Sequence, residues 1–222
     1  MQVDHTRVTI PRARTPGAGR TLYRIKPVFV AVLAPIRDRL ASAGVHADAV
    51  TAAALPVQVA MFATLVAGTL HSAVWIAVAP LALLLMALNA LDGSLARATG
   101  AYSARGAVFN ELTDRGGDLI VLTAGFFVAP MWIAFAAFAA VAASEIVAVV
   151  GWATTGERIF TGPMGKPDRA AVLAAGAMIA VIWSPALPLS FALIAIGAAV
   201  GAVVRTRSAF ARAMDIDSGA RR

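Results

Sequence analysis

Long apolar stretches separated by short polar connections run through most of the chain. Six of them lie between residues 49 and 204 and consist largely of Ala, Val, Leu, Ile and Phe. A helix needs about 20 such residues to cross a bilayer, so the pattern predicts an all-α integral membrane protein with six transmembrane helices. The fifth stretch is short, and Ser184 with Pro185 closes its outer end. The predicted spans are 49–69, 73–91, 107–129, 131–152, 170–184 and 187–204.

The segment before the first span combines charge with helical periodicity. Residues 21–43 place apolar side chains on one stripe and most of their Lys and Arg off it, which predicts an amphipathic helix on the membrane surface, ended by Gly44. An ordinary packed helix explains the same spacing equally well. Residues 1–20 lack the apolar run of a signal peptide and are expected to form a polar cytoplasmic tail, and 206–222 a second, basic one. The membrane domain then covers 44–205.

Composition narrows the class of protein. Hydrophobic residues make up 59% of the 222 residues and charged residues only 14%, whereas soluble domains have about 25% charged residues. An ordinary soluble domain and a disordered chain are therefore excluded. The sequence contains no cysteine, which excludes a disulfide scaffold, thiol catalysis and thiolate metal sites. The three histidines show no metal-ligand spacing.

The positions of the basic residues predict the orientation in the membrane. The 19 Lys and Arg residues exceed the 12 acidic ones and lie in the terminal segments and in the connections 92–106 and 153–169, with Arg115 as the exception. Because cytoplasmic loops carry the positive charge, both termini are expected inside a bacterial cytoplasmic membrane, where the basic tails contact anionic lipids. Nucleic acid is not an expected partner. The four tryptophans fall near span ends and are expected at the membrane interface: Trp75, Trp132, Trp152 and Trp183.

Polar residues gather at the inner ends of the second and third spans. Asn89 and Asp92 are three positions apart, so they share one helix face. Asn110 and Asp114 are four positions apart on the next helix. Two facing helices would bring these four side chains together as a cage of oxygen atoms, the kind of site that binds Mg²⁺, Mn²⁺ or Ca²⁺ rather than Zn²⁺. Further acidic candidates for the same metal site lie on the third span: Glu111 and Asp118.

A contiguous stretch around this cluster resembles a family signature. It reads Asp92-Gly93-x2-Ala96-Arg97-x8-Gly106-x3-Asn110-x3-Asp114. This is similar to the signature of the CDP-alcohol phosphatidyltransferase family, D-x2-D-G-x2-A-R followed after about eight residues by G-x3-D-x3-D. Six of the eight fixed positions are identical. Two further segments resemble the same family: YRIKPVFVAVLAPIRDRLASAGVHADAVT, which leads into the first span, and GPMGKPDRA at 162–170.

The resemblance implies a fold and an activity. Members of the family have six transmembrane helices and a surface helix, and they transfer a phosphatidyl group from a CDP-linked lipid such as CDP-diacylglycerol to a small alcohol, releasing CMP, in phospholipid biosynthesis. The resemblance also implies Mg²⁺ or Mn²⁺ as cofactor and a homodimer. At the matching positions Asp92 would ligate metal, Asn89 would do so less strongly, and Asp114 would ligate metal and act as general base. The residues implied to line the CDP pocket are Gly93, Ala96, Arg97 and Gly106.

The departures from the family pattern concern charge. Asn89 and Asn110 stand where the family has its first and third aspartates, so two negative charges are lost. The two remaining carboxylates balance only half of the charge of two divalent cations. We therefore expect rearranged ligands, with one strongly bound metal instead of two. In the second basic connection, Lys166 and Arg169 are expected to bind a phosphate of the acceptor or of the lipid donor.

Several of the charged residues fit a structural role as well as a catalytic one. Glu111 and Asp118 are equally well explained as structural ion pairs with Arg115 or other cations. Glu145 in the fourth span either faces the polar cavity or bonds a neighbouring helix, and the structural role is slightly favoured. The alternative function is a catalytically impaired relative that binds lipid or nucleotide in the membrane. A small transporter is disfavoured, because its polar residues are expected at mid-membrane, whereas here they lie toward one face. The signature leaves the alcohol acceptor open.

Overall fold

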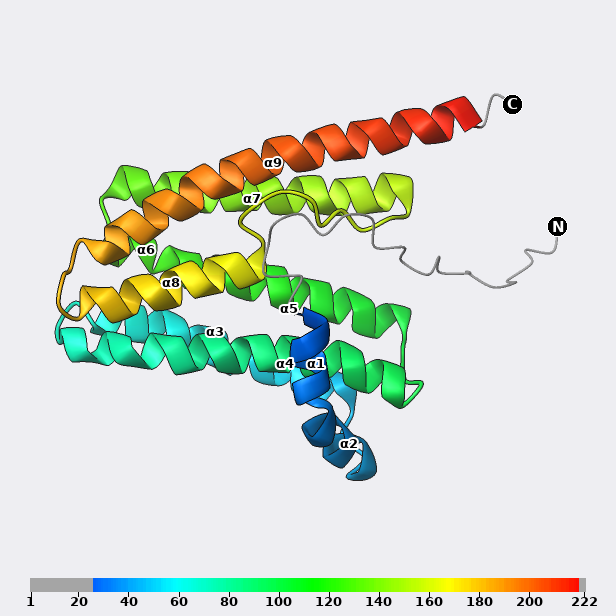
Figure 1. The fold of residues 1–222 in the computed structure, drawn as a ribbon, viewed down its shortest axis with the longest axis horizontal. Coiled ribbons are helices and arrows are strands. Elements are labelled where there is room, and N and C mark those ends of the chain that lie inside the picture. The colour runs from blue at the N-terminus through cyan, green and yellow to red at the C-terminus, as the bar shows by residue number, and fades with distance from the viewer. Residues whose placement is uncertain (1–25, 220–222) are drawn as a thin grey trace.

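The computed structural model describes residues 26–219 and is built from helices (Figure 1). Within this range no strand forms. The predicted tail 1–20 and the start of the predicted helix 21–43 lie outside the described residues, as do residues 220–222. The elements are α1 (Lys26–Val32), α2 (Ala34–Ser42), α3 (Ala47–Ala67), the 3-10 helix η2 (Ser72–Ala77), α4 (Val78–Ala98), α5 (Ala104–Thr123), α6 (Gly125–Val128), α7 (Met131–Thr155), α8 (Lys166–Ala180) and α9 (Ala186–Gly219).

Helices occupy the places of all six predicted spans. Among residues 26–219, four helical stretches are long and apolar enough to cross a membrane: α3, η2 continued by α4, α7 and α9. α5 differs because its 20 residues include five charged side chains, and α8 because it has only 15 residues. Membrane spans at α3, α4, α7 and α9 therefore agree with the prediction, and spans at α5 and α8 stay a prediction. α9 also continues as one helix to Gly219, through most of the predicted basic tail.

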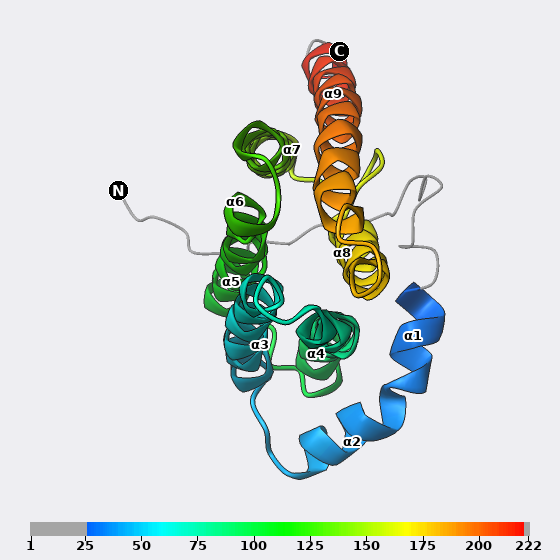
Figure 2. The ribbon, with the colours of Figure 1, turned by 90° about the vertical axis from the view of Figure 1, so that its left-hand side faces the viewer.

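The predicted surface helix consists of two helices in its described part. α1 ends before Leu33 and α2 begins after it, because Pro35 lacks the N–H that would continue the helical hydrogen bonds and its ring crowds the preceding turn. Leu33 packs with Leu91 and Leu95 of α4, whereas Val28 is 64% exposed. Figure 2 shows both helices along the side of the bundle next to α4. The segment therefore packs against the bundle and also exposes apolar side chains.

Gly44 ends α2, and this prediction is confirmed. Its φ angle is +69°, in the left-handed region that favours glycine. The N–H of Gly44 donates to the Ala41 carbonyl oxygen at 3.1 Å, and the N–H of Val45 donates to the Leu40 carbonyl oxygen at 3.0 Å. These two bonds satisfy carbonyl groups that the end of the helix would otherwise leave free.

Two sets of helices lie side by side and are bridged by α8 (Figure 2). α3 packs against α4 and α5, α7 packs along α9, and α8 contacts both α4 and α9. The main apolar core lies toward the ends of the helices that short connections join, and its members include Met61, Leu65, Leu122, Phe191 and Ile194. The charged side chains of α4, α5, α7 and α8 lie toward the opposite ends. The bundle therefore has an apolar end and a polar end.

Trp75 lies inside the protein, which differs from the predicted position at the membrane interface. Its side chain is 6% exposed, and its indole N–H donates to the Leu65 carbonyl oxygen at 2.9 Å. The ring covers Gly68, where an added Cβ atom would lie 2.0 Å from the indole nitrogen. Trp132 and Trp183, by contrast, are 72% and 52% exposed. The packing of the Trp75 ring on Gly68 therefore holds the connection between α3 and α4 against the end of α3.

Replacing Gly68 by alanine is expected to lower the free energy of unfolding by about 1–3 kcal/mol, because the new methyl group overlaps the Trp75 ring. The measurement is the Tm of the purified protein in detergent micelles. Gly116→Ala is the matched control, since a Cβ atom there meets nothing within 4 Å and alanine is the better helix former. Equal Tm values for the two variants would contradict the packing described here.

Candidate active site

The polar end of the bundle encloses a cavity of about 580 Å³. Its walls come from α3, α4, α5, α7, α8 and α9, together with the connections between them. Of the residues predicted to form the site, the cavity is lined by all but Asp118: Asn89, Asp92, Gly93, Ala96, Arg97, Gly106, Asn110, Glu111, Asp114, Lys166 and Arg169. The structure therefore brings together side chains that are up to 80 positions apart in the sequence.

A tight turn connects α4 to α5, and both helices pack against α3. Residues 99–103 connect the two helices, and Gly100 within them has a φ angle of +64°. Ser103 starts α5 by accepting a hydrogen bond from the N–H of Gly106 at 3.0 Å. A Cβ atom at Gly106 would lie 3.0 Å from Oδ1 of Asp48, so glycine lets the start of α3 approach the cavity wall. The two signature helices are therefore joined by this turn and packed on the same helix, α3.

Each aspartate of the signature accepts a hydrogen bond from the asparagine of the facing helix. Nδ2 of Asn110 on α5 donates to Oδ2 of Asp92 on α4. In the orientation that satisfies both of its neighbours, the amide of Asn89 on α4 donates to Oδ1 of Asp114 on α5 at 3.0 Å. Thr51 of α3 adds a third donor, 3.1 Å from Oδ2 of Asp92. The two asparagines therefore act here as hydrogen-bond donors to the carboxylates.

Lys166 brings a positive charge to this cluster from the first residue of α8. Its Nζ lies 2.8 Å from Oδ1 of Asp114 and, in the same amide orientation, 2.9 Å from the amide oxygen of Asn89. The start of the helix is fixed by Asp168, which accepts a hydrogen bond from the N–H of Gly165 at 2.9 Å. The side chain predicted to bind phosphate is thus paired with the predicted general base.

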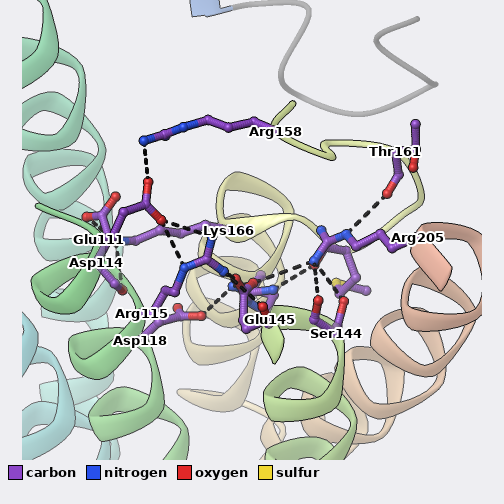
Figure 3. Close-up of polar contacts among 12 residues, drawn as sticks. Glu111, Asp114, Arg115, Asp118, Ser144, Glu145, Arg158, Thr161, Lys166 and Arg205 are labelled. Carbon is purple, nitrogen blue, oxygen red and sulfur yellow. Dashed lines mark hydrogen bonds and ion pairs between the residues drawn. The ribbon is translucent and has the colours of Figure 1, made fainter. Parts of the chain in front are cut away.

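A second group of charges surrounds Glu145 of α7 (Figure 3). Its carboxylate pairs with Arg115 of α5, with Arg169 of α8 at 3.0 Å and with Arg205 of α9 at 3.7 Å. Arg169 also pairs with Asp118 of α5 and has only 2% of its side chain exposed. Glu145 and Asp118 therefore connect neighbouring helices, and Arg169 is held within this network. Glu145 also lines the cavity, so both alternatives considered for it are met.

Glu111 belongs to the same network rather than to the amide–aspartate cluster. Its carboxylate lies 2.9 Å from Nη2 of Arg115 and 2.6 Å from Nη2 of Arg158. Arg158 also stacks on Trp152, with 4.5 Å between the guanidinium carbon and the ring centroid. The structural ion pair considered for Glu111 is therefore formed, and it fixes the connection after α7 over the cavity (Figure 3).

Sequence reasoning missed several residues of the cavity wall. Arg205 is 5% exposed, and its Nη1 donates to Oγ of Ser144 at 2.8 Å. Its Nε donates to the carbonyl oxygen of Thr161 at 3.2 Å. The signal that could have found it was an arginine placed directly after an apolar span, together with a Ser–Glu pair inside another span. Such positions are costly in a membrane and usually face a polar interior.

The oxygen atoms at the cluster suit a hard divalent cation. Carboxylate and amide oxygens are the ligands that Mg²⁺ and Mn²⁺ prefer, and Asp92, Asp114, Asn89 and Asn110 line one cavity. Within residues 26–219, however, no three His, Cys, Asp or Glu side chains come together as a metal site. The expectation of one divalent cation instead of two therefore stays a prediction.

Two solved structures share the fold. The phosphatidylinositol phosphate synthase PgsA1 of Mycobacterium tuberculosis with CDP-DAG bound superposes with a TM-score of 0.66 at 21% identity, over 83% of this chain and 94% of that one. The same synthase in complex with manganese and citrate gives a TM-score of 0.65 at 22% identity, over 79% and 88%. The arrangement of helices is therefore that of a known membrane enzyme.

A curated relative shows the family. The inner membrane protein YnbA of Escherichia coli strain K12 is 32% identical over 163 residues, which cover 68% of this chain and 76% of YnbA. No family model matches the chain. At this identity and coverage the chain belongs to the family of YnbA, and with its apolar helices it is a membrane protein.

Replacing Arg169 by methionine is expected to lower the free energy of unfolding by about 3–5 kcal/mol, because two carboxylates, Asp118 and Glu145, lose their buried partner. Thermal unfolding in detergent micelles measures the loss. Arg207→Met is the control, since Arg207 is an exposed residue of α9. A loss no larger than that of the control would show that the network does not hold α8 in place.

Proposed function

We propose that this member of the YnbA family is a transferase that moves a phosphatidyl group from a CDP-linked lipid such as CDP-diacylglycerol to an alcohol, releasing CMP, in phospholipid biosynthesis. The observation that carries the proposal is the position of the signature. Its residues lie on two consecutive helices and line one cavity, in a fold shared with the synthase PgsA1, one structure of which has CDP-DAG bound.

The charge of the cavity supports an anionic substrate. Its lining holds six basic side chains and five acidic ones, so it has a formal positive excess before a cation binds. We place the CDP group against the small residues Gly93, Ala96 and Gly106, and its phosphates near Arg97. The opening lies at the polar end of the bundle, which we place at the cytoplasmic surface, where lipid headgroups and soluble alcohols meet.

The chemistry needs one proton acceptor and charge neutralisation. The oxygen of the alcohol forms a bond to the phosphorus that carries the diacylglycerol, and the bond from that phosphorus to the CMP oxygen breaks. Asp114 takes the proton of the alcohol; both of its side-chain contacts, with Lys166 and Asn89, use Oδ1, so we assign the proton to Oδ2. A divalent cation held by Asp92 and its neighbours would neutralise the diphosphate and improve the leaving group.

The remaining charged residues have supporting roles in this proposal. Arg169 positions α8 and thereby Lys166, since it is buried against Asp118 and Glu145. Lys166 is 19% exposed and lines the cavity, so its positive charge lies close to where we place the diphosphate of the donor. The six-span topology with both termini in the cytoplasm also belongs to the proposal, because the cations of the connections then share one side.

Purified protein is expected to release CMP from CDP-diacylglycerol when Mg²⁺ or Mn²⁺ and a suitable alcohol are added. A panel of alcohols, with mass spectrometry of the lipid product, identifies the acceptor. Asp114→Asn is expected to reduce the rate by about 10²-fold or more, because the general base is lost.

Asp215→Asn is the matched control, because Asp215 is an exposed carboxylate near the end of α9. Equal rates for the two variants would contradict the role of Asp114. Nucleotide binding without CMP release for any alcohol would instead support the catalytically impaired relative.

A further inference from the structure

The ammonium of Lys166 lies in a position typical of a bound cation. Three oxygen atoms surround Nζ: Oδ1 of Asp114 at 2.8 Å, the backbone carbonyl oxygen of Asp114 at 3.3 Å and the amide oxygen of Asn89 at 2.9 Å. These atoms belong to the two signature helices, α4 and α5, whereas the lysine comes from α8. A third helix therefore inserts its charge between the two that were expected to share metal ions.

The position of this ammonium is fixed by the protein. Lys166 is the first residue of α8, and Asp168 caps that helix through the N–H of Gly165. One turn further, Arg169 anchors the helix through Asp118, Glu145 and, at 2.9 Å, the carbonyl oxygen of Met164. The side chain of Lys166 thus extends from a helix start that cannot easily shift.

Charge explains why an amide stands at position 89. Asn89, Asp114 and Lys166 together carry no net charge, and each hydrogen-bonds the other two. A carboxylate in place of Asn89 would leave a net negative charge there, which attracts a divalent cation. The asparagine and the lysine are therefore complementary, and both reduce the need for a metal ion on the Asp114 side of the cluster.

We propose that the Lys166 ammonium takes the place of a divalent cation between Asn89 and Asp114, so that the site binds one divalent ion, on the Asp92 side. The inference rests on the proposed function, because it assigns the charge that neutralises the donor diphosphate. Part of that charge is then built into the chain, and the remainder is supplied by a single metal ion.

Counting bound Mn²⁺ tests the proposal without any substrate. Electron paramagnetic resonance and calorimetry on protein purified in detergent give the number of ions and their affinity. The main comparison uses three proteins: the wild type, Asn89→Asp/Lys166→Met and Asn89→Asp/Lys166→Arg. The two double variants share the restored carboxylate and differ only in the charge at position 166. Gel filtration and the Tm of each confirm folding, and Asn89→Asp/Lys166→Gln serves as a second uncharged variant.

The wild type and the arginine variant are expected to bind one Mn²⁺, and the methionine variant two. The second ion is expected to bind the methionine variant at least about tenfold more tightly than the arginine variant, because a fixed charge is removed at close range. Two ions in the wild type, one ion in the methionine variant, or no ion in any of the proteins would each overturn the proposal.

Measuring CMP release in parallel separates this inference from the proposed function. One ion in the wild type together with no CMP release for any alcohol would leave the assignment of Lys166 standing and contradict the transferase. Metal-dependent CMP release together with two ions in the wild type would support the transferase and contradict the assignment of Lys166.

Discussion

The carboxylate of Glu145 is the interaction on which the polar end of the bundle depends. It lies on α7 and pairs with arginines of α5, α8 and α9. Charged groups inside a membrane protein are costly unless they are paired, so each of these helices has one favourable position relative to α7. The ion pairs therefore add to close core packing in fixing where α5, α8 and α9 lie around the cavity.

Five acidic residues at the polar end fall into two groups. Glu111, Asp118 and Glu145 pair with arginines and hold helices together. Asp92 and Asp114 instead face amides, a hydroxyl and a lysine. The positions of Asp114 and Lys166 depend on the arginine ion pairs. Arg115 directly follows Asp114, and Arg169 is one turn beyond Lys166. The alignment of the reactive groups is thus set by residues that need not touch a substrate.

Features that depend on local spacing were predictable from the sequence. The helices, the end of α2 at Gly44 and the grouping of Asn89 with Asp92 follow from periodicity within a few turns. The ion pair between Glu145 and Arg205 was not predictable, because these residues are 60 positions apart and nothing in their spacing identifies the partner. The buried position of Trp75 depends on Gly68, seven residues earlier, and that contact exists only once the chain has turned. Likewise, the amide groups were expected as ligands, but their nitrogens face the carboxylates.

The two asparagines also change how a site of this kind balances charge. Four carboxylates would hold helices α4 and α5 apart by repulsion until cations bind between them. Here each helix offers one hydrogen-bond donor and one hydrogen-bond acceptor to the other, so hydrogen bonds stand where two further carboxylates would repel. In the proposed reaction, the diphosphate of the donor would meet a wall that already carries the charge of Lys166, and electrostatic stabilisation of this preorganised kind costs little rearrangement.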